Sequence, residues 1–330
     1  MTINANPDAN STNTLTIKPS LSNTTISGSS ASAVFILNGA DYVTINGSIS
    51  GTSNSICPPV SASRDLTISN TNTGTSSAVI WLQTNVADGA TNNAIRNCNI
   101  VGNASTTTLV GIGSGSSTIG TSSLGTGNNN NSFENNNIRA VQVGIYSQGA
   151  SAANKNTGTN IRQNQMNFPS GFNQNIRTAA VFVGFENNIN ISGNNIGSVI
   201  GSGADGFGIA CGSIGISTST FTGNEVINAT ITNNKIDSIR AASTFSVSGI
   251  YIVTATNAGT NLIANNVISN TSINGTGGDF GSGIFVGGGG VSTNIYFNSV
   301  SITGTLTGGN QPNFALAIGG SNPVVDVRNN

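Results

Sequence analysis

The sequence predicts an all-β solenoid, in which short strands wind into coils that stack along a single axis. Three observations support this fold class: a pattern that returns at a fixed interval, an odd spacing of apolar residues within it, and a low content of charged residues. Together they predict one continuous domain over residues 1–330, with roughly ten or eleven coils.

The repeated pattern is clearest from Ile231 to the last residue. It reads ITNNKI, IANNVI, IYFNSV and VRNN, and each copy begins 32 residues after the previous one. Looser copies begin at Ile95, Phe133, Ile161 and Ile191, with spacings between 28 and 40 residues. This variation is expected, because insertions in a solenoid enter its loops and leave the stack unchanged.

Two apolar residues of each copy are five positions apart, as at Ile231 and Ile236. Side chains alternate between the faces of a strand, so an unbroken strand would place these two on opposite sides. The chain must therefore bend between them, and we expect the bend at the Asn three positions after the start. Asn tolerates the left-handed conformation, and its amide can bond to the same amide in the next coil. The sequence thus predicts a structural ladder of Asn136, Asn164, Asn194, Asn234, Asn266 and Asn298, with Cys98 in one upstream slot.

Composition agrees with a solenoid and excludes several classes of protein. Charged residues make up 6% of the chain, and the periodic Ile and Val argue against disorder. The net charge of -1 gives no basis for binding nucleic acid or an anionic membrane. No apolar run approaches the roughly 20 residues of a membrane span, and no sustained helical period occurs.

Both ends of the sequence look cut, so we expect a piece of a longer secreted or cell-surface protein. The first ten residues lack the basic and apolar segments of a signal peptide, and neither end offers an amphipathic cap. We expect the ends to be continued or covered by neighbours. Three cysteines, Cys57, Cys98 and Cys211, cannot all pair, so we favour free buried thiols over a disulfide framework.

A second recurring strand, with an aliphatic first residue, provides the candidate binding site. Its middle position is predicted to point outward, and six of its nine members are aromatic, in a chain with 5% aromatic residues. Two interpretations remain open: the rings form an exposed strip for sugar rings or a partner, or they stabilise the stack beneath an arm such as 113–131. The candidate residues are Phe35, Trp81, Tyr146, Phe182, Tyr251 and Phe285.

Catalytic chemistry has little support. The chain has no His, which excludes Ser-His-Asp and Cys-His arrangements and His-ligated metals, so we expect no metal and no cofactor. Its 11 acidic residues are scattered, and Asp205 and Asp279 are the one separated pair in similar glycine-rich contexts. Turn Asp residues are far commoner than such pairs, so catalysis is the less favoured interpretation.

Several motifs of the sequence resemble those of a known family. They are the NN-x-I corners, the GIYI and GIFV strands, and segments such as LNGADYVTING, ATNNAIRNCNI and VVDVRNN. They resemble the right-handed, single-stranded parallel β-helix repeats of the pectate-lyase-like superfamily, in the versions found in very large secreted bacterial surface proteins. The resemblance implies a surface-exposed adhesive or structural module. The charged clusters of the enzymes in that superfamily cannot be placed on this sequence.

We therefore expect a non-catalytic extracellular structural or adhesion module that binds a polysaccharide or cell-surface ligand through the aromatic column. One alternative is a polysaccharide lyase or hydrolase of the β-helix type, which requires acidic side chains converging in a groove. Another is a fibre subunit that self-associates end to end through uncapped strand edges.

Overall fold

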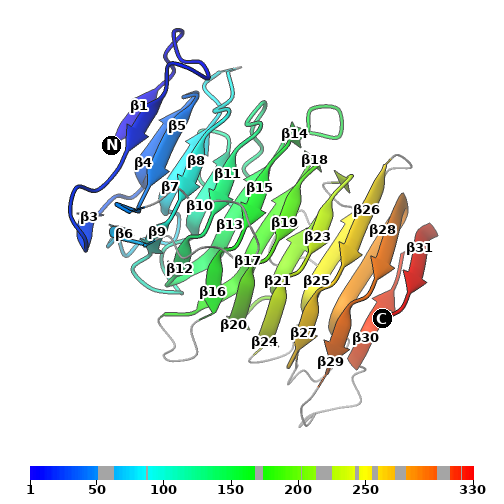
Figure 1. Ribbon diagram of the computed structural model, residues 1–330. Helices are drawn as coiled ribbons and strands as arrows, with labels where there is room; N and C mark the ends of the chain where they lie inside the picture. The colour runs from blue at the N-terminus through cyan, green and yellow to red at the C-terminus, as the bar shows by residue number, and fades with distance from the viewer. Residues whose placement is uncertain are drawn as a thin grey trace.

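The computed structural model describes residues 1–50, 63–86, 88–167, 174–201, 203–212, 225–241, 245–254, 259–271, 280–302, 313–320 and 322–330. In these ranges the secondary structure consists of β-strands. The strands lie side by side from β1 near the N-terminus to β31 near the C-terminus (Figure 1). All pairings between these strands are parallel, for example β13 with β17 and β25 with β28. The chain is therefore a parallel β-helix, as the sequence predicts.

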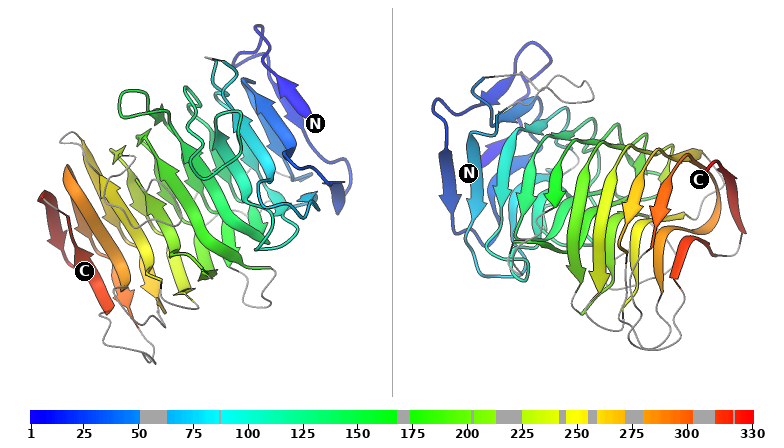
Figure 2. Two further views of the ribbon diagram at one scale, coloured as in Figure 1. Left: turned by 180° about the vertical axis from the view of Figure 1, so that it is seen from behind. Right: turned by 60° about the horizontal axis from the view of Figure 1, so that its bottom comes forward.

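The strands of successive coils form three faces, which are visible as rows of neighbouring strands (Figures 1 and 2), and the described part of the last coil contributes only to faces 1 and 2. Face 1 carries the second recurring strand of the sequence. It comprises β1 (Thr2–Asn4), β4 (Ala33–Asn38), β7 (Ala78–Gln83), β10 (Val110–Gly115), β13 (Val141–Gln148), β17 (Ile176–Gly184), β21 (Gly206–Cys211), β25 (Val247–Thr254), the first part of β28 (Gly281–Tyr296) and β30 (Asn313–Ile318).

Face 2 carries the first half of the repeated Asn pattern. It comprises β2 (Leu15–Ile17), β5 (Val43–Asn46), β8 (Ala94–Arg96), β11 (Ser132–Glu134), β15 (Asn160–Arg162), β19 (Asn190–Ser192), β23 (Thr230–Thr232), β26 (Thr260–Ala264), the last part of β28 and β31 (Asn322–Arg328).

Face 3 carries the second half of that pattern. It comprises β3 (Thr24–Gly28), β6 (Leu66–Asn70), β9 (Cys98–Val101), β12 (Asn137–Arg139), β16 (Gln165–Asn167), β20 (Asn195–Gly201), β24 (Lys235–Ala241), β27 (Val267–Ser269) and β29 (Ser299–Ser301). A small corner sheet between faces 1 and 2 is formed by β14 (Asn156–Thr157), β18 (Glu186–Asn187) and β22 (Val226–Ile227). Among the described residues, face 1 has ten strands, in agreement with the predicted number of coils.

The core is a stack of aliphatic side chains inside the coils. Ile231 on β23 and Ile236 on β24 are both fully buried, although five residues separate them. Each pairs in register with an Ile of the next coil, Ile263 and Ile268. Like side chains therefore stack at the spacing of neighbouring strands, about 4.8 Å, and burial of each one stabilises the fold by about 1.5–3 kcal/mol.

The corner between faces 2 and 3 lies where the spacing predicts it, but the left-handed residue is the one before the predicted Asn. Asn233 has φ 57° and Asn265 has φ 56°, whereas Asn234 and Asn266 do not have positive φ. The first residue of the NN pair thus makes the turn, and the second turns its side chain inward. In the other coils the corresponding residue with positive φ is Asn97, Asn135, Gln163, Gly193, Phe297 or Asn329.

No helix of the described residues has the length and apolar character needed to cross a membrane.

Candidate functional site

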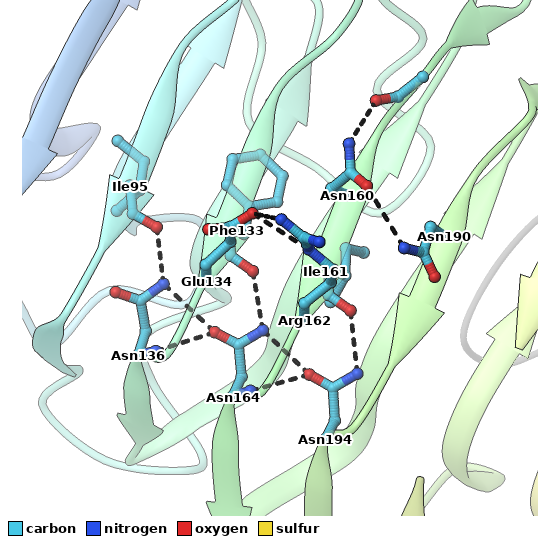
Figure 3. A network of polar contacts seen from close by, with 11 residues as sticks. Ile95, Phe133, Glu134, Asn136, Asn160, Ile161, Arg162, Asn164, Asn190 and Asn194 are labelled. Carbon is cyan, nitrogen blue, oxygen red and sulfur yellow. Dashed lines mark hydrogen bonds and ion pairs between the residues drawn. The ribbon is translucent and has the colours of Figure 1, made fainter. Parts of the chain in front are cut away.

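The predicted Asn residues lie in one row inside the corner between faces 2 and 3, and Figure 3 shows three of them. Each side chain donates from Nδ2 to the Oδ1 of the row member in the following coil, at 2.8–3.2 Å. Each Oδ1 also accepts the backbone N–H of the preceding member, as in the 3.0 Å bond from Asn234 to Asn266. The row, called the Asn ladder below, comprises Asn136, Asn164, Asn194, Asn234, Asn266, Asn298 and Asn330.

The Asn ladder also ties the side chains to the main chain of the neighbouring coil. Nδ2 of Asn164 donates to the carbonyl of Phe133 at 2.9 Å, and Nδ2 of Asn194 donates to the carbonyl of Ile161 at 3.0 Å. Ladder members such as Asn136 and Asn266 are fully buried, and hydrogen bonds to protein groups replace the contacts of their side chains with water. The arrangement is chemically inert and holds the coils in register.

Cys98 occupies the ladder slot ahead of Asn136, as predicted. Its backbone N–H donates to Asn136 Oδ1 at 3.1 Å, and its thiol is fully buried. Burial raises the pKa of the Cys98 thiol to about 12, so it stays protonated and unreactive. In the coil before, the Leu66 N–H already donates to the Gly47 carbonyl. An Asn at position 98 would therefore lack the backbone donor that its Oδ1 has in the other coils.

Of the other cysteines, Cys211 is also buried and unpaired, in agreement with the expectation of free thiols. Cys57 lies outside the described residues.

A second set of inward Asn residues, between faces 1 and 2, was not predicted. The Asn93 N–H donates to Asn131 Oδ1 at 3.0 Å, and the Asn128 N–H donates to Asn156 Oδ1 at 3.1 Å. The sequence contains a signal for part of this set. Asn93 and Asn131 each stand two residues before the first apolar residue of a pattern copy, on the same side of the strand as that residue.

The aromatic column exists on the outer side of face 1, but its rings are buried. Trp81, Tyr146 and Phe182 are fully buried, and Tyr251 and Phe285 are at most 4% exposed. Trp81 stacks on Tyr146 at 5.7 Å between ring centroids, and Tyr146 stacks on Phe182 at 5.9 Å. Tyr251 stacks on Phe285 at 4.9 Å. The rings thus form a second hydrophobic core outside the coils, and these five residues do not form an exposed strip.

Small residues interrupt the column, and neighbouring rings fill the gaps. Gly113 stands in register between Trp81 and Tyr146, and the Trp81 indole leans over it so closely that a Cβ at position 113 would overlap the ring. Phe207 contacts the Tyr251 ring at a centroid distance of 5.1 Å, on the coil where the column itself has only Ala210. Such complementary packing is typical of a protein interior.

A strap of residues 116–125 covers the N-terminal part of the column. Trp81 Nε1 donates to the Ser116 carbonyl at 2.9 Å, and Tyr146 Oη donates to the Ser123 carbonyl at 2.8 Å. Ser123 Oγ also accepts the Ser116 N–H at 3.0 Å, which holds the two ends of the strap together. The polar atoms of both rings are therefore satisfied by the strap, which lies within the arm 113–131 that the structural interpretation proposed as a cover.

Phe35 does not belong to the column. Strand β4 pairs with β7 so that Phe35 is opposite Ile80 and Ile36 is opposite Trp81. Phe35 therefore points into the main core, where it is 2% exposed. The prediction was wrong at this position because both Phe35 and its neighbour Ile36 are apolar, so the pattern does not distinguish two registers that differ by one residue.

Charged side chains on the outside form short contacts along the axis. Arg96, Glu134 and Arg162 are in register on successive coils of face 2, and Arg162 forms an ion pair with Glu134 (Figure 3). On face 3, Asp237 accepts hydrogen bonds from Ser269 Oγ at 2.6 Å and from Asn270 Nδ2 at 2.7 Å. Among the described residues no group of three or more His, Cys, Asp and Glu side chains is placed to hold a metal ion.

Comparison with known proteins adds little to this picture. No protein-family model matches the chain, and no curated protein matches it. Among solved structures it is similar to the Streptococcus pneumoniae surface protein and adhesin PfbA, with 13% sequence identity, a TM-score of 0.33, and coverage of 92% of this chain and 84% of that chain. The parallel strand pairings described above establish the fold.

Proposed function

We propose that the chain is a non-catalytic structural and adhesion module of an exported protein, a stiff rod that holds binding surfaces away from a cell. The observation that supports this proposal is the Asn ladder, which runs without interruption from Asn136 to Asn330 and joins every coil in that range to the next. Axial side-chain bonds of this kind add to the strand pairings and oppose bending of the stack.

The variable parts of the chain lie outside this rigid stack. Successive ladder residues are 28, 30, 40, 32, 32 and 32 positions apart, yet each donates to the next with the same geometry. The extra residues must therefore enter loops, which are the segments where binding surfaces vary most readily. A rigid core with variable loops suits a module that presents contacts to a partner.

The acidic residues of the described chain do not favour the enzymatic alternative. Burial raises the pKa of Glu186 to about 8. Glu186 is fully buried, so no polysaccharide can reach it. Asp205 is 6% exposed and accepts the Ser246 N–H at 3.0 Å, and Asp279 lies outside the described residues. No feature of the described residues provides the converging acidic pair that glycoside hydrolysis requires.

Two measurements test the proposal. Small-angle scattering together with electron microscopy should show a straight particle of uniform width. Microspheres coated with the chain should be retained on arrays of polysaccharides and extracellular-matrix proteins, and the polysaccharides should not be cleaved. Steady release of reducing or unsaturated ends would instead establish an enzyme. If the microspheres are retained on none of the surfaces, the chain is not an adhesion module. If the particle is flexible or globular, it is not a stiff rod.

A further inference from the structure

The corner sheet contains a carboxyl group in a slot that Asn occupies in the coil before it. Glu186 pairs in register with Asn156 below it and with Val226 above it. The Asn128 N–H donates to Asn156 Oδ1 at 3.1 Å, so Asn128, Asn156 and Glu186 form consecutive members of an inward row. Glu186 is completely buried.

The described residues that donate to this carboxyl group are neutral. Ser147 Oγ donates to Oε1 at 2.6 Å and Thr159 Oγ1 donates to Oε2 at 2.9 Å, and the uncharged Asn156 side chain lies beside them. These groups come from β13, from the segment before β15 and from β14, which are three of the elements packed against Glu186. None of them carries a charge that would balance a buried carboxylate.

The titratable groups at this corner do not supply that charge either. The Cys211 thiol on β21 is fully buried near Glu186, and burial together with this carboxyl group raises the thiol pKa far above its ordinary value. Lys155, next to β14, and Glu225, next to β22, form an ion pair with each other. Each stands one residue before the inward row, and the ion pair balances the two charges against each other.

An ionised carboxylate without a partner is strongly disfavoured in such a place. Burial raises the pKa of Glu186 from 4.5 to about 8, although its polar neighbours Ser147, Thr159 and Asn156 act in the opposite direction. Because the folded pKa is raised, the folded corner binds the proton more tightly than an opened corner does. Its stability is therefore complete below about 4.5 and is lost as the pH rises towards about 8.

We propose that Glu186 makes the corner sheet a proton-dependent weak point, which is closed in acid and opens locally as the surroundings become alkaline. The opening is confined to β14, β18 and β22 because the Asn ladder, on the opposite side of β15, β19 and β23, contains no titratable group. A rod built in this way is stiffest in acid and gains a flexible point near its middle in mildly alkaline surroundings.

Amide hydrogen exchange of the full chain, followed from about pH 5 to about pH 9, tests this proposal. The protection factors of amides in the corner sheet, such as Asn156, Gly158 and Asn188, should fall about tenfold per pH unit between roughly 5 and 8 and then level off. The total change should stay within a factor of roughly a few thousand, because the pKa interval is 4.5 to about 8.

Glu186→Gln keeps the size of the side chain and removes its titration, so its protection factors should not vary with pH. Glu134→Gln, which removes an outer carboxyl group of the Arg162 ion pair, is the matched control and should behave like the parent chain. An equal pH dependence in Glu186→Gln would overturn the proposal, as would a fall in protection spread evenly over all faces.

If Glu186→Gln does not fold, the infrared spectrum of the unaltered chain decides the question. A band of a protonated carboxyl group should persist at about pH 6, where exposed carboxyl groups are ionised, and should disappear with a midpoint near 8. Absence of that band at about pH 6 would show that Glu186 is ionised in the folded chain and would refute the weak point.

Discussion

Replacement of Asn266 by Ala is the most direct test of the Asn ladder. Asn266 Nδ2 donates to the Ile231 carbonyl and to Asn298 Oδ1, both at 2.9 Å. Its Oδ1 accepts the N–H of Asn234 at 3.0 Å and the Nδ2 of Asn234 at 2.9 Å. The substitution removes all four bonds in a place that water does not reach, since Asn266 is fully buried.

The expected magnitude follows from what each partner retains. Asn234 Nδ2 keeps its bond to the Ile191 carbonyl, and Asn298 Oδ1 keeps the N–H of residue 266. The Asn234 N–H and the Ile231 carbonyl each lose their bond to this side chain. A buried polar group left without its partner costs about 1–3 kcal/mol, so we expect Asn266→Ala to lower the free energy of unfolding by about 3 kcal/mol.

Urea denaturation followed by circular dichroism measures this loss, with Asn103→Ala as the control. Asn103 is exposed, and its side chain makes one 3.2 Å contact with Thr107, so its removal should cost less than about 0.5 kcal/mol. Equal stabilities of the two variants would refute the ladder as a source of stability. Because a long repeat array can unfold in steps, the slopes of the transitions must be compared along with their midpoints.

Three further predictions concern the aromatic column and the corners. Gly113→Ala should displace the Trp81 indole and destabilise the chain by about 1–3 kcal/mol, whereas Gly120→Ala, with no atom within 4 Å of its Cβ, should be neutral by thermal denaturation. Trp81 is the only Trp of the chain, so folded protein should show blue-shifted fluorescence that iodide does not quench; strong quenching would mean that the strap does not cover the ring. Phe297 has φ 55° and is 57% exposed, so Phe297→Asn should stabilise the chain by about 0.5–1 kcal/mol in urea denaturation, and a loss of stability would show that the ring makes contacts of its own.

The sequence predicts the winding of this chain well because period and parity are local properties. Five residues between Ile231 and Ile236 require a bend, and the 32-residue repeat places one bend above another. The same reasoning did not locate the left-handed residue, since both members of an Asn-Asn pair accept that conformation. Asn233 turns the chain, and Asn234 is then directed inward to bond with its neighbours in the row.

The environment of the aromatic rings was not predictable in the same way. Alternation shows that Trp81 points away from the main core, but it does not reveal what lies on that side. The residues that accept its hydrogen bond and cover it, 116–125, are more than thirty positions away and are rich in Ser and Gly without any period. Glu186 was missed for a related reason, because a single carboxyl group in an Asn slot leaves no repeated signal.

The amides of the Asn ladder all face the same way along the rod, with each nitrogen directed at the oxygen of the following coil. Their dipoles therefore add head to tail, as peptide dipoles do in an α-helix. Aligned groups of this kind polarise one another, so an interior amide such as Asn234 should contribute more to stability than Asn136, which no ladder amide precedes. Although its net charge is only -1, the molecule thus has a dipole moment along its long axis.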